Sequence, residues 1–200
     1  MGTTKSKRRV KIVESIASAI SSKKIFDTID YRNRNEDYIK QYMHQPLISE
    51  LEELYENLEL SKSMDKDLVK QKAKNCLLWE GDVNTTVNNF TFFGTQHRPD
   101  FVVKIDKLSV AVEVKKGETG SSLREGIGQS LVYSSAFDFV VYLYVDISKD
   151  KKIRDSMNGV KEQELINDLW TIRLHLQNLL LQKCNDFEVA CISKLIKNTN

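Results

Sequence analysis

Two apolar runs separated by a short polar step constrain the fold of this chain more than any other feature. The step is Ile105-Asp-Lys-Leu108, whose polar centre is typical of a tight turn. Runs rich in β-branched and aromatic residues on both sides of such a turn predict two antiparallel strands. The sequence therefore predicts a β-hairpin built from these residues: Phe101, Val102, Val103, Ile105, Leu108, Val110, Ala111, Val112 and Val114.

Charged side chains gather at one end of this hairpin. Asp100 opens the first strand directly after Pro99, and Glu113 and Lys115 lie inside the second strand. Since side chains alternate along a strand, Glu113 and Lys115 point to the same face. Asp100 begins the neighbouring strand and can reach the same end. The pattern predicts two carboxylates and an ammonium at one place, although a half-exposed strand with a solvated charged face would also produce Glu-x-Lys.

Two carboxylates near a lysine are typical of metal-dependent chemistry at a phosphoryl group. Mg²⁺ prefers oxygen ligands, usually one or two carboxylates completed by water and substrate phosphate. Such a metal polarises a phosphoryl oxygen and lowers the pKa of a water molecule. A neighbouring lysine can orient or deprotonate that water, or offset negative charge as it develops.

Three short motifs occur in an order that resembles a known superfamily. Pro99-Asp100 is followed thirteen positions later by Glu113-Val114-Lys115, and Gln129-Ser-Leu-Val-Tyr133 comes after both. The first two resemble the motif of the PD-(D/E)xK nucleases, and the third resembles the Gln-x-x-x-Tyr motif of some branches, notably exonucleases of recombination complexes. The resemblance covers about residues 65–147. It implies an α/β, restriction-endonuclease-like fold, in which helices flank a mixed central β-sheet of about four or five strands.

The same resemblance implies a metal-dependent DNA endonuclease that hydrolyses phosphodiester bonds. Asp100 and Glu113 would bind Mg²⁺ or Mn²⁺ with the help of the Val114 carbonyl. Lys115 would position or activate the attacking water.

Further candidate residues lie outside the hairpin. Gln129 would support the site from the following helix, and Tyr133 is an accessory candidate on the same helix face. Members of the superfamily often take an additional acidic residue from the helix before the core, and Glu53, Glu56 and Glu80 are the candidates. A solvated helix face would also explain these glutamates.

Hydrophobic periodicity orders the rest of the chain. We expect a helical N-terminal extension over residues 1–62 and a nuclease core with a C-terminal helix over residues 63–200. In the helix expected at 122–136, the stripe Leu123, Ile127, Leu131 and Ser134 is expected to face the sheet, and Gly126 and Gly128 indicate a close backbone approach. The remaining expected elements are helices at 8–22 and 37–60, a helix from Ser63, a strand pattern at 79–93, a central strand at 138–146, a helix at 162–183 and an edge strand at 187–192.

Composition limits which other classes of protein this chain can belong to. The three cysteines are scattered with no Cys-x-x-Cys, which disfavours a disulfide framework and a structural zinc or iron–sulfur site. No apolar run approaches the ~18–20 residues of a membrane span, and no signal-peptide pattern opens the chain. We therefore expect an intracellular, cytoplasmic protein with no membrane contact. The net charge of +2 means that a nucleic-acid surface must come from local clustering.

Several functions share this chemistry. Small size and no obvious target-recognition domain favour structure-specific cleavage by a homodimer, as in Holliday junction resolvases. A restriction endonuclease and an exonuclease are the alternatives, and there is a fainter likeness to small nucleases of archaeal viruses and plasmids. A non-catalytic, nuclease-like DNA-binding module and a helical interaction protein are the alternatives outside catalysis.

Overall fold

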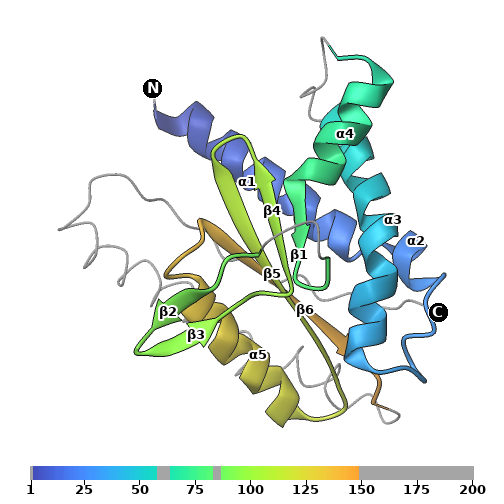
Figure 1. Ribbon diagram of the computed structural model, residues 1–200, viewed down its shortest axis with the longest axis vertical. Helices are drawn as coiled ribbons and strands as arrows, with labels where there is room; N and C mark the ends of the chain where they lie inside the picture. The colour runs from blue at the N-terminus through green and yellow to red at the C-terminus, as the bar shows by residue number, and fades with distance from the viewer. Residues whose placement is uncertain (1, 58–63, 83–86, 149–200) are drawn as a thin grey trace.

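The centre of the molecule is a four-stranded mixed sheet (Figure 1). The computed structural model describes residues 2–57, 64–82 and 87–148 of the chain, and the side chains from residue 8 onward. The strand order is β1-β4-β5-β6, in which β1, β4 and β5 are antiparallel neighbours and β6 lies parallel to β5. The strands are β1 (Leu77–Trp79), β4 (Phe101–Ile105), β5 (Leu108–Gly117) and β6 (Phe139–Asp146). The expected α/β architecture with a mixed sheet flanked by helices is confirmed.

The predicted hairpin is formed by β4 and β5. Phe101 pairs with Val112 and Ile105 with Leu108, so the turn consists of Asp106 and Lys107. Asp106 has a φ of 55°, a left-handed conformation that Asp tolerates better than most residues. With ten residues, β5 is twice as long as β4, and its second half pairs only with β6. That overhang carries the end of β5 past the first residue of β4.

One face of the sheet carries an aliphatic core. Alternate residues of the three longer strands pack there against helices α1 (Gly2–Ile20), α2 (Lys23–Phe26), α3 (Glu36–Asn57) and α4 (Lys66–Cys76). The stripe of α3 that enters this core has helical spacing, as expected for an amphipathic helix. Its largest fully buried members are Ile39, Met43, Leu47 and Leu51.

Helix α5 (Gly120–Tyr133) covers the opposite face and forms the crossover between the parallel strands β5 and β6 (Figure 1). The predicted sheet-facing stripe is only partly right, because Leu131 is 41% exposed while Gly126, Ser130 and Tyr133 are buried. The helix is turned so that Gly126 lies against the ring of Tyr142, where a Cβ atom would overlap the ring. Gly126 thus provides the expected close approach, whereas Gly128 faces open space.

The segment before the hairpin differs from the single strand pattern expected at 79–93. β1 ends at Trp79, and β2 (Phe90–Phe92) pairs with β3 (Thr95–His97) in a separate small hairpin. Helix α4 starts at Lys66 rather than Ser63, because the carboxylate of Asp65 caps it by accepting a hydrogen bond from Leu68 N at 2.7 Å.

The strand at 138–146 was expected at the centre of the sheet, but β6 is the last strand in the order among the described residues. Its apolar run arises because α1 packs on one face and α5 on the other. Residues from both sides of the expected boundary at 62/63 share the aliphatic core. The helix expected at 162–183 and the strand at 187–192 lie outside the described residues. Within the described part, no helix is long and apolar enough to cross a membrane.

Candidate active site

Asp100 directly precedes the first residue of β4 and is buried, with 5% of its surface exposed. One carboxylate oxygen, Oδ2, accepts a hydrogen bond from Val114 N at 2.7 Å, and the other, Oδ1, accepts one from Lys40 Nζ at 2.7 Å. The main chain is also held, because Glu80 N donates to the Asp100 carbonyl at 3.1 Å. The side chain of Asp100 therefore extends the β4–β5 pairing by one step and is fixed against β5.

Glu113 and Lys115 lie on the same face of β5, as predicted. Val112 and Val114 belong to the aliphatic core on the other face, so the alternation along the strand is strict. Glu113 is only 2% exposed, and its Oε1 lies 3.2 Å from Lys115 Nζ. The structure thus brings Asp100, Glu113 and Lys115 together at the end of the hairpin.

The first turns of α3 add two residues that sequence reasoning missed. Lys40 Nζ lies 3.3 Å from Glu36 Oε1, and Lys115 Nζ lies 3.5 Å from the same oxygen. The other oxygen of Glu36 accepts a hydrogen bond from Lys116 N at 3.1 Å. A signal was available for Lys40, because it occupies the apolar stripe of α3 three residues before Met43. A lysine in a buried stripe needs a partner, and here the partner is Asp100.

The three accessory glutamates lie in different places, and one of them lies in the cluster. Glu80 follows β1 and joins the cluster, with Oε1 3.6 Å from Lys40 Nζ and Oε2 3.1 Å from an Arg98 nitrogen. Glu53 pairs instead with Lys24 at 2.9 Å, near the other end of α3 and about 25 Å from Glu36 at 1.5 Å rise per residue. Glu56 lies one turn beyond Glu53 and is exposed. Neither Glu53 nor Glu56 joins the cluster.

Burial sets the proton affinities of the two central acids. It raises the pKa of Glu113 to about 7, helped by the negative charge of Asp100 and opposed by Lys115. Burial also raises the pKa of Asp100, although the Lys40 ammonium and the Val114 N–H act in the opposite direction. A group that gains or loses a proton near neutral pH is suited to acid–base chemistry.

Both lysines are ammonium ions at neutral pH. Burial alone would lower the pKa of Lys115, but the charges of Glu113 and Glu36 outweigh it, and the pKa is raised. The same balance holds at Lys40, where burial lowers the pKa while the hydrogen bond and charge of Asp100 raise it further. Lys115 can therefore orient a water molecule or stabilise negative charge, but it is not a base as it stands.

Helix α5 contributes the residues of the third motif. The Tyr133 hydroxyl donates a hydrogen bond to the Arg98 carbonyl at 3.0 Å, which supports the segment that leads into Asp100. Burial and the nearby charge of Glu113 raise the pKa of Tyr133, so its hydroxyl stays protonated. Gln129 lies one turn earlier, and its Oε1 is buried without a hydrogen-bond partner among the described residues. A buried acceptor of this kind costs about 1–3 kcal/mol until a donor reaches it.

The donor set suits a hard divalent cation. Glu36, Glu80, Asp100 and Glu113 supply only carboxylate oxygen, and positively charged side chains occupy the space between them. No three His, Cys, Asp or Glu side chains in the described part of the chain are placed to share one ion. Mg²⁺ commonly uses only one or two carboxylates and completes its shell with water and substrate phosphate. The residues present fit that pattern.

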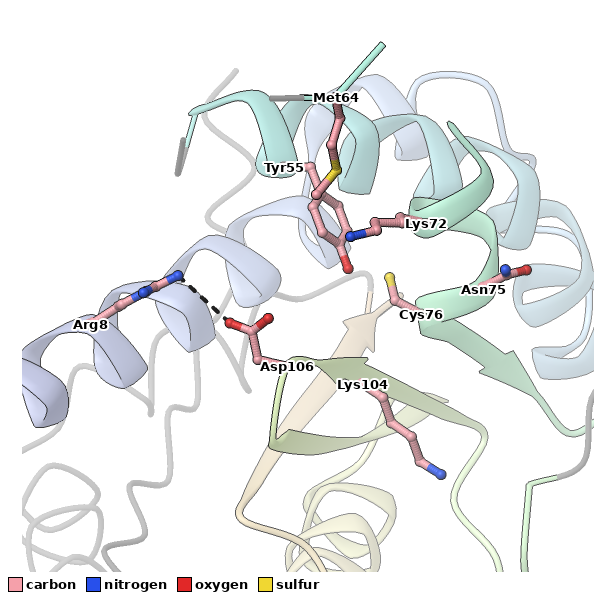
Figure 2. A pocket seen from close by; sticks show the side chains of 8 residues that line it. All are labelled: Arg8, Tyr55, Met64, Lys72, Asn75, Cys76, Lys104 and Asp106. Atoms are coloured by element: carbon pink, nitrogen blue, oxygen red, sulfur yellow. Dashed lines mark ion pairs between the residues drawn. The ribbon is translucent and has the colours of Figure 1, made fainter. Parts of the chain in front are cut away.

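A cavity elsewhere in the protein is separate from this cluster. A pocket of about 430 Å³ lies at the turn end of the β4–β5 hairpin, where Arg8 lies 3.7 Å from Asp106. Figure 2 shows the side chains that line it. The length of β4 puts it roughly 17–20 Å from Asp100 at 3.3 Å per residue. Its lining residues are Arg8, Tyr55, Met64, Lys72, Asn75, Cys76, Lys104 and Asp106. It includes none of the clustered carboxylates.

Comparisons of the chain with protein-family models, curated proteins and solved structures find no match. The function is therefore inferred from the geometry of the cluster and from the three motifs.

Proposed function

We propose that this protein is a Mg²⁺- or Mn²⁺-dependent deoxyribonuclease that hydrolyses phosphodiester bonds, with the restriction-endonuclease-like fold that its motifs imply. The supporting observation is the convergence of Asp100, Glu113 and Lys115 at the overhanging end of β5. A folded protein has little reason to bury two acids side by side, because burying charge is costly. Buried acids with perturbed pKa values that lie side by side are typical of a functional site.

Each residue has a distinct role in this proposal. Asp100 and Glu113 would hold the metal, which supplies Lewis-acid activation of the phosphoryl group when bound. Val114 N already points toward Asp100, and in a strand the N–H and C=O of one residue point to the same side, so its carbonyl is available there as well. Lys115 orients the attacking water or stabilises charge on the phosphoryl oxygens. Gln129 offers an unpaired acceptor to a water molecule.

A nucleic-acid substrate needs local positive charge, because the whole chain carries only +2. Lys116 Nζ donates to the carbonyls of Arg32 and Arg34, which holds that arginine-bearing loop at the end of β5 beside the acids. Arg98 lies next to Glu80, in the segment that leads into β4. These three arginines are the groups that we propose to contact DNA phosphates. Within the class we favour a homodimer that cuts branched DNA, like the Holliday junction resolvases, over a restriction endonuclease or an exonuclease.

Cleavage of a substrate panel tests the proposal. Linear duplex, single strand, flap, four-way junction and supercoiled plasmid are incubated with Mg²⁺, Mn²⁺ or EDTA. We expect metal-dependent cutting that Lys115→Ala lowers at least about 100-fold, the usual loss when one charge-stabilising group is removed. Lys104→Ala is the matched control, because Lys104 is an exposed lysine on β4 at the turn end.

The outcomes separate the alternatives. Unchanged metal-dependent cutting by Lys115→Ala or Asp100→Ala contradicts the proposed site. Cutting of four-way junctions without cutting of linear duplex identifies the resolvase-like branch, and degradation from duplex ends identifies an exonuclease.

One observation favours a second candidate, a non-catalytic nuclease-like fold that binds DNA. Both oxygens of Asp100 are already engaged, one by Lys40 and one by Val114 N. DNA binding that is equally strong in EDTA, with no cutting under any metal, would identify this function instead.

A further inference from the structure

Lys40 occupies a position that the nuclease motifs do not explain. Its ammonium comes from α3, a helix on the aliphatic side of the sheet, and reaches Asp100 across 60 residues of sequence. The side chain is only 10% exposed. Nζ lies 2.7 Å from Asp100 Oδ1, 3.3 Å from Glu36 Oε1 and 3.6 Å from Glu80 Oε1. The ammonium therefore sits among three carboxylates as a positive point charge.

The charge balance of the cluster depends on the Lys40 ammonium. When Glu113 is ionised, the four clustered carboxylates face three cationic groups among the described residues, namely Lys40, Lys115 and Arg98. Without Lys40 they face two, which leaves the two negative charges that one divalent cation neutralises. An ammonium and a divalent cation are thus alternative ways of balancing the same acids.

The two oxygens of Asp100 are held differently. Oδ2 is tied to Val114 N, a backbone group of β5 that cannot move without breaking the strand. Among the described residues, Oδ1 is bonded only to Lys40 Nζ, which is the end of a flexible four-carbon chain. Asp37 lies on the solvent side of α3, 86% exposed and 3.7 Å from Lys40 Nζ. A displaced ammonium therefore has another carboxylate to move toward.

We propose that Lys40 is a tethered cation that competes with the divalent metal for Asp100, so that metal binds only by displacing it. This inference rests on the proposed function, because it concerns the affinity of the same site. Lys40 keeps the acid cluster neutral enough to fold when no metal is present, and it raises the metal concentration that the site requires.

Metal titration tests the inference without using activity. The metal-free full-length protein is titrated calorimetrically with Mn²⁺, and the wild type is compared with Lys40→Gln, Lys40→Arg and the surface control Lys104→Gln. We expect Lys40→Gln to bind Mn²⁺ at least about tenfold more tightly, since one unit of positive charge has left a buried site. Lys40→Arg keeps the charge and is expected to bind no more tightly than the wild type.

Thermal unfolding in EDTA and in Mn²⁺ provides a second measurement. Lys40→Gln leaves the carboxylates under-compensated, so we expect its melting temperature to rise more on Mn²⁺ addition than that of the wild type. If the variant unfolds in EDTA, recovery of a cooperative transition in Mn²⁺ supports the same conclusion. A variant that stays unfolded in both conditions overturns the inference, because Lys40 is then required by the fold whatever else is bound.

The remaining outcomes distinguish the two proposals. Wild type that binds Mn²⁺ while Lys40→Gln binds it equally or more weakly overturns the role of Lys40 and leaves the nuclease proposal intact. If neither protein binds Mn²⁺ or Mg²⁺ at millimolar concentration, both the metal-dependent nuclease and the competing lysine are contradicted.

Discussion

The two faces of the sheet are built from different types of residue. On the α3 side, the strands contribute Val110, Val112 and Val114, and a continuous aliphatic core meets them. On the α5 side, the same strand contributes Ala111, Glu113 and Lys115, and the packing includes tyrosines and a glycine. Alternation along β5 therefore places its valines on one face and Glu113 and Lys115 on the other. One face provides packing stability, and the other carries the charged cluster on a support that the first face holds rigid.

The largest expected contrast is between two leucines. Leu51→Ala removes a fully buried side chain from the aliphatic face and is expected to cost about 3–5 kcal/mol. Leu123→Ala removes a partly buried side chain that packs on Tyr142 and Tyr144, and it is expected to cost about 1–2 kcal/mol. Urea unfolding measures both. Equal costs would show that the α5 face contributes as much packing energy as the other face and would break the comparison.

The pH dependence of stability tests the same comparison on the α5 face, which carries Glu113. The Glu113 carboxyl has a pKa of about 7 in the folded protein against 4.5 ordinarily, mainly because of burial. Between these values the folded protein holds a proton that the unfolded chain has lost, so stability falls as pH rises through this window. The shift corresponds to about 3 kcal/mol at 1.36 kcal/mol per pH unit.

Urea unfolding in EDTA from pH 5 to pH 8 checks this expectation, with Glu113→Gln as the comparison. The variant cannot ionise at this position, and its stability should decline less over the same range. An equal loss of stability in both proteins would show that the proton responsible is not bound to Glu113.

The smallest expected effects concern the two glycines of α5. Gly126→Ala would put a methyl group into the ring of Tyr142 and is expected to cost about 1–3 kcal/mol. Gly128→Ala meets no atom within 4 Å and is expected to stabilise the helix by about 0.5–1 kcal/mol. Opposite signs in thermal unfolding would confirm that α5 touches the sheet along its Gly126 edge. A loss at both positions would contradict the orientation described for the helix.

Much of the fold could be predicted because it depends on local patterns. The β4–β5 hairpin follows from two apolar runs and a polar turn, and the parallel β6 follows from a helix between two strands. The orientation of α5 could not be predicted, since the regular stripe that includes Leu131 competes with a close approach at Gly126 that only the packed Tyr142 reveals. Similarly, the capping role of Asp65 moves the start of α4.

In the candidate site, too, the residues close in sequence could be predicted and the distant ones could not. Asp100, Glu113 and Lys115 lie within sixteen residues of each other, so a hairpin and the alternation along its second strand predict that they meet. Glu36 and Lys40 belong to a helix far away in sequence, and nothing local indicates what they contact. The glutamate-rich end of α3 predicts Glu53 and Glu56 as candidates, but the helix is long enough to separate them from the cluster.

The sixty residues between Lys40 and Asp100 also have a consequence for folding kinetics. The β4–β5 hairpin is a local contact that can form in microseconds, whereas contacts between distant segments wait for the loop between them to close. We therefore expect the acids of the hairpin to be brought together early and the ammonium of α3 to arrive late. The nascent chain would then pass through a stage in which Asp100 and Glu113 face each other without Lys40, and divalent cations present during folding would find the acids before the lysine does.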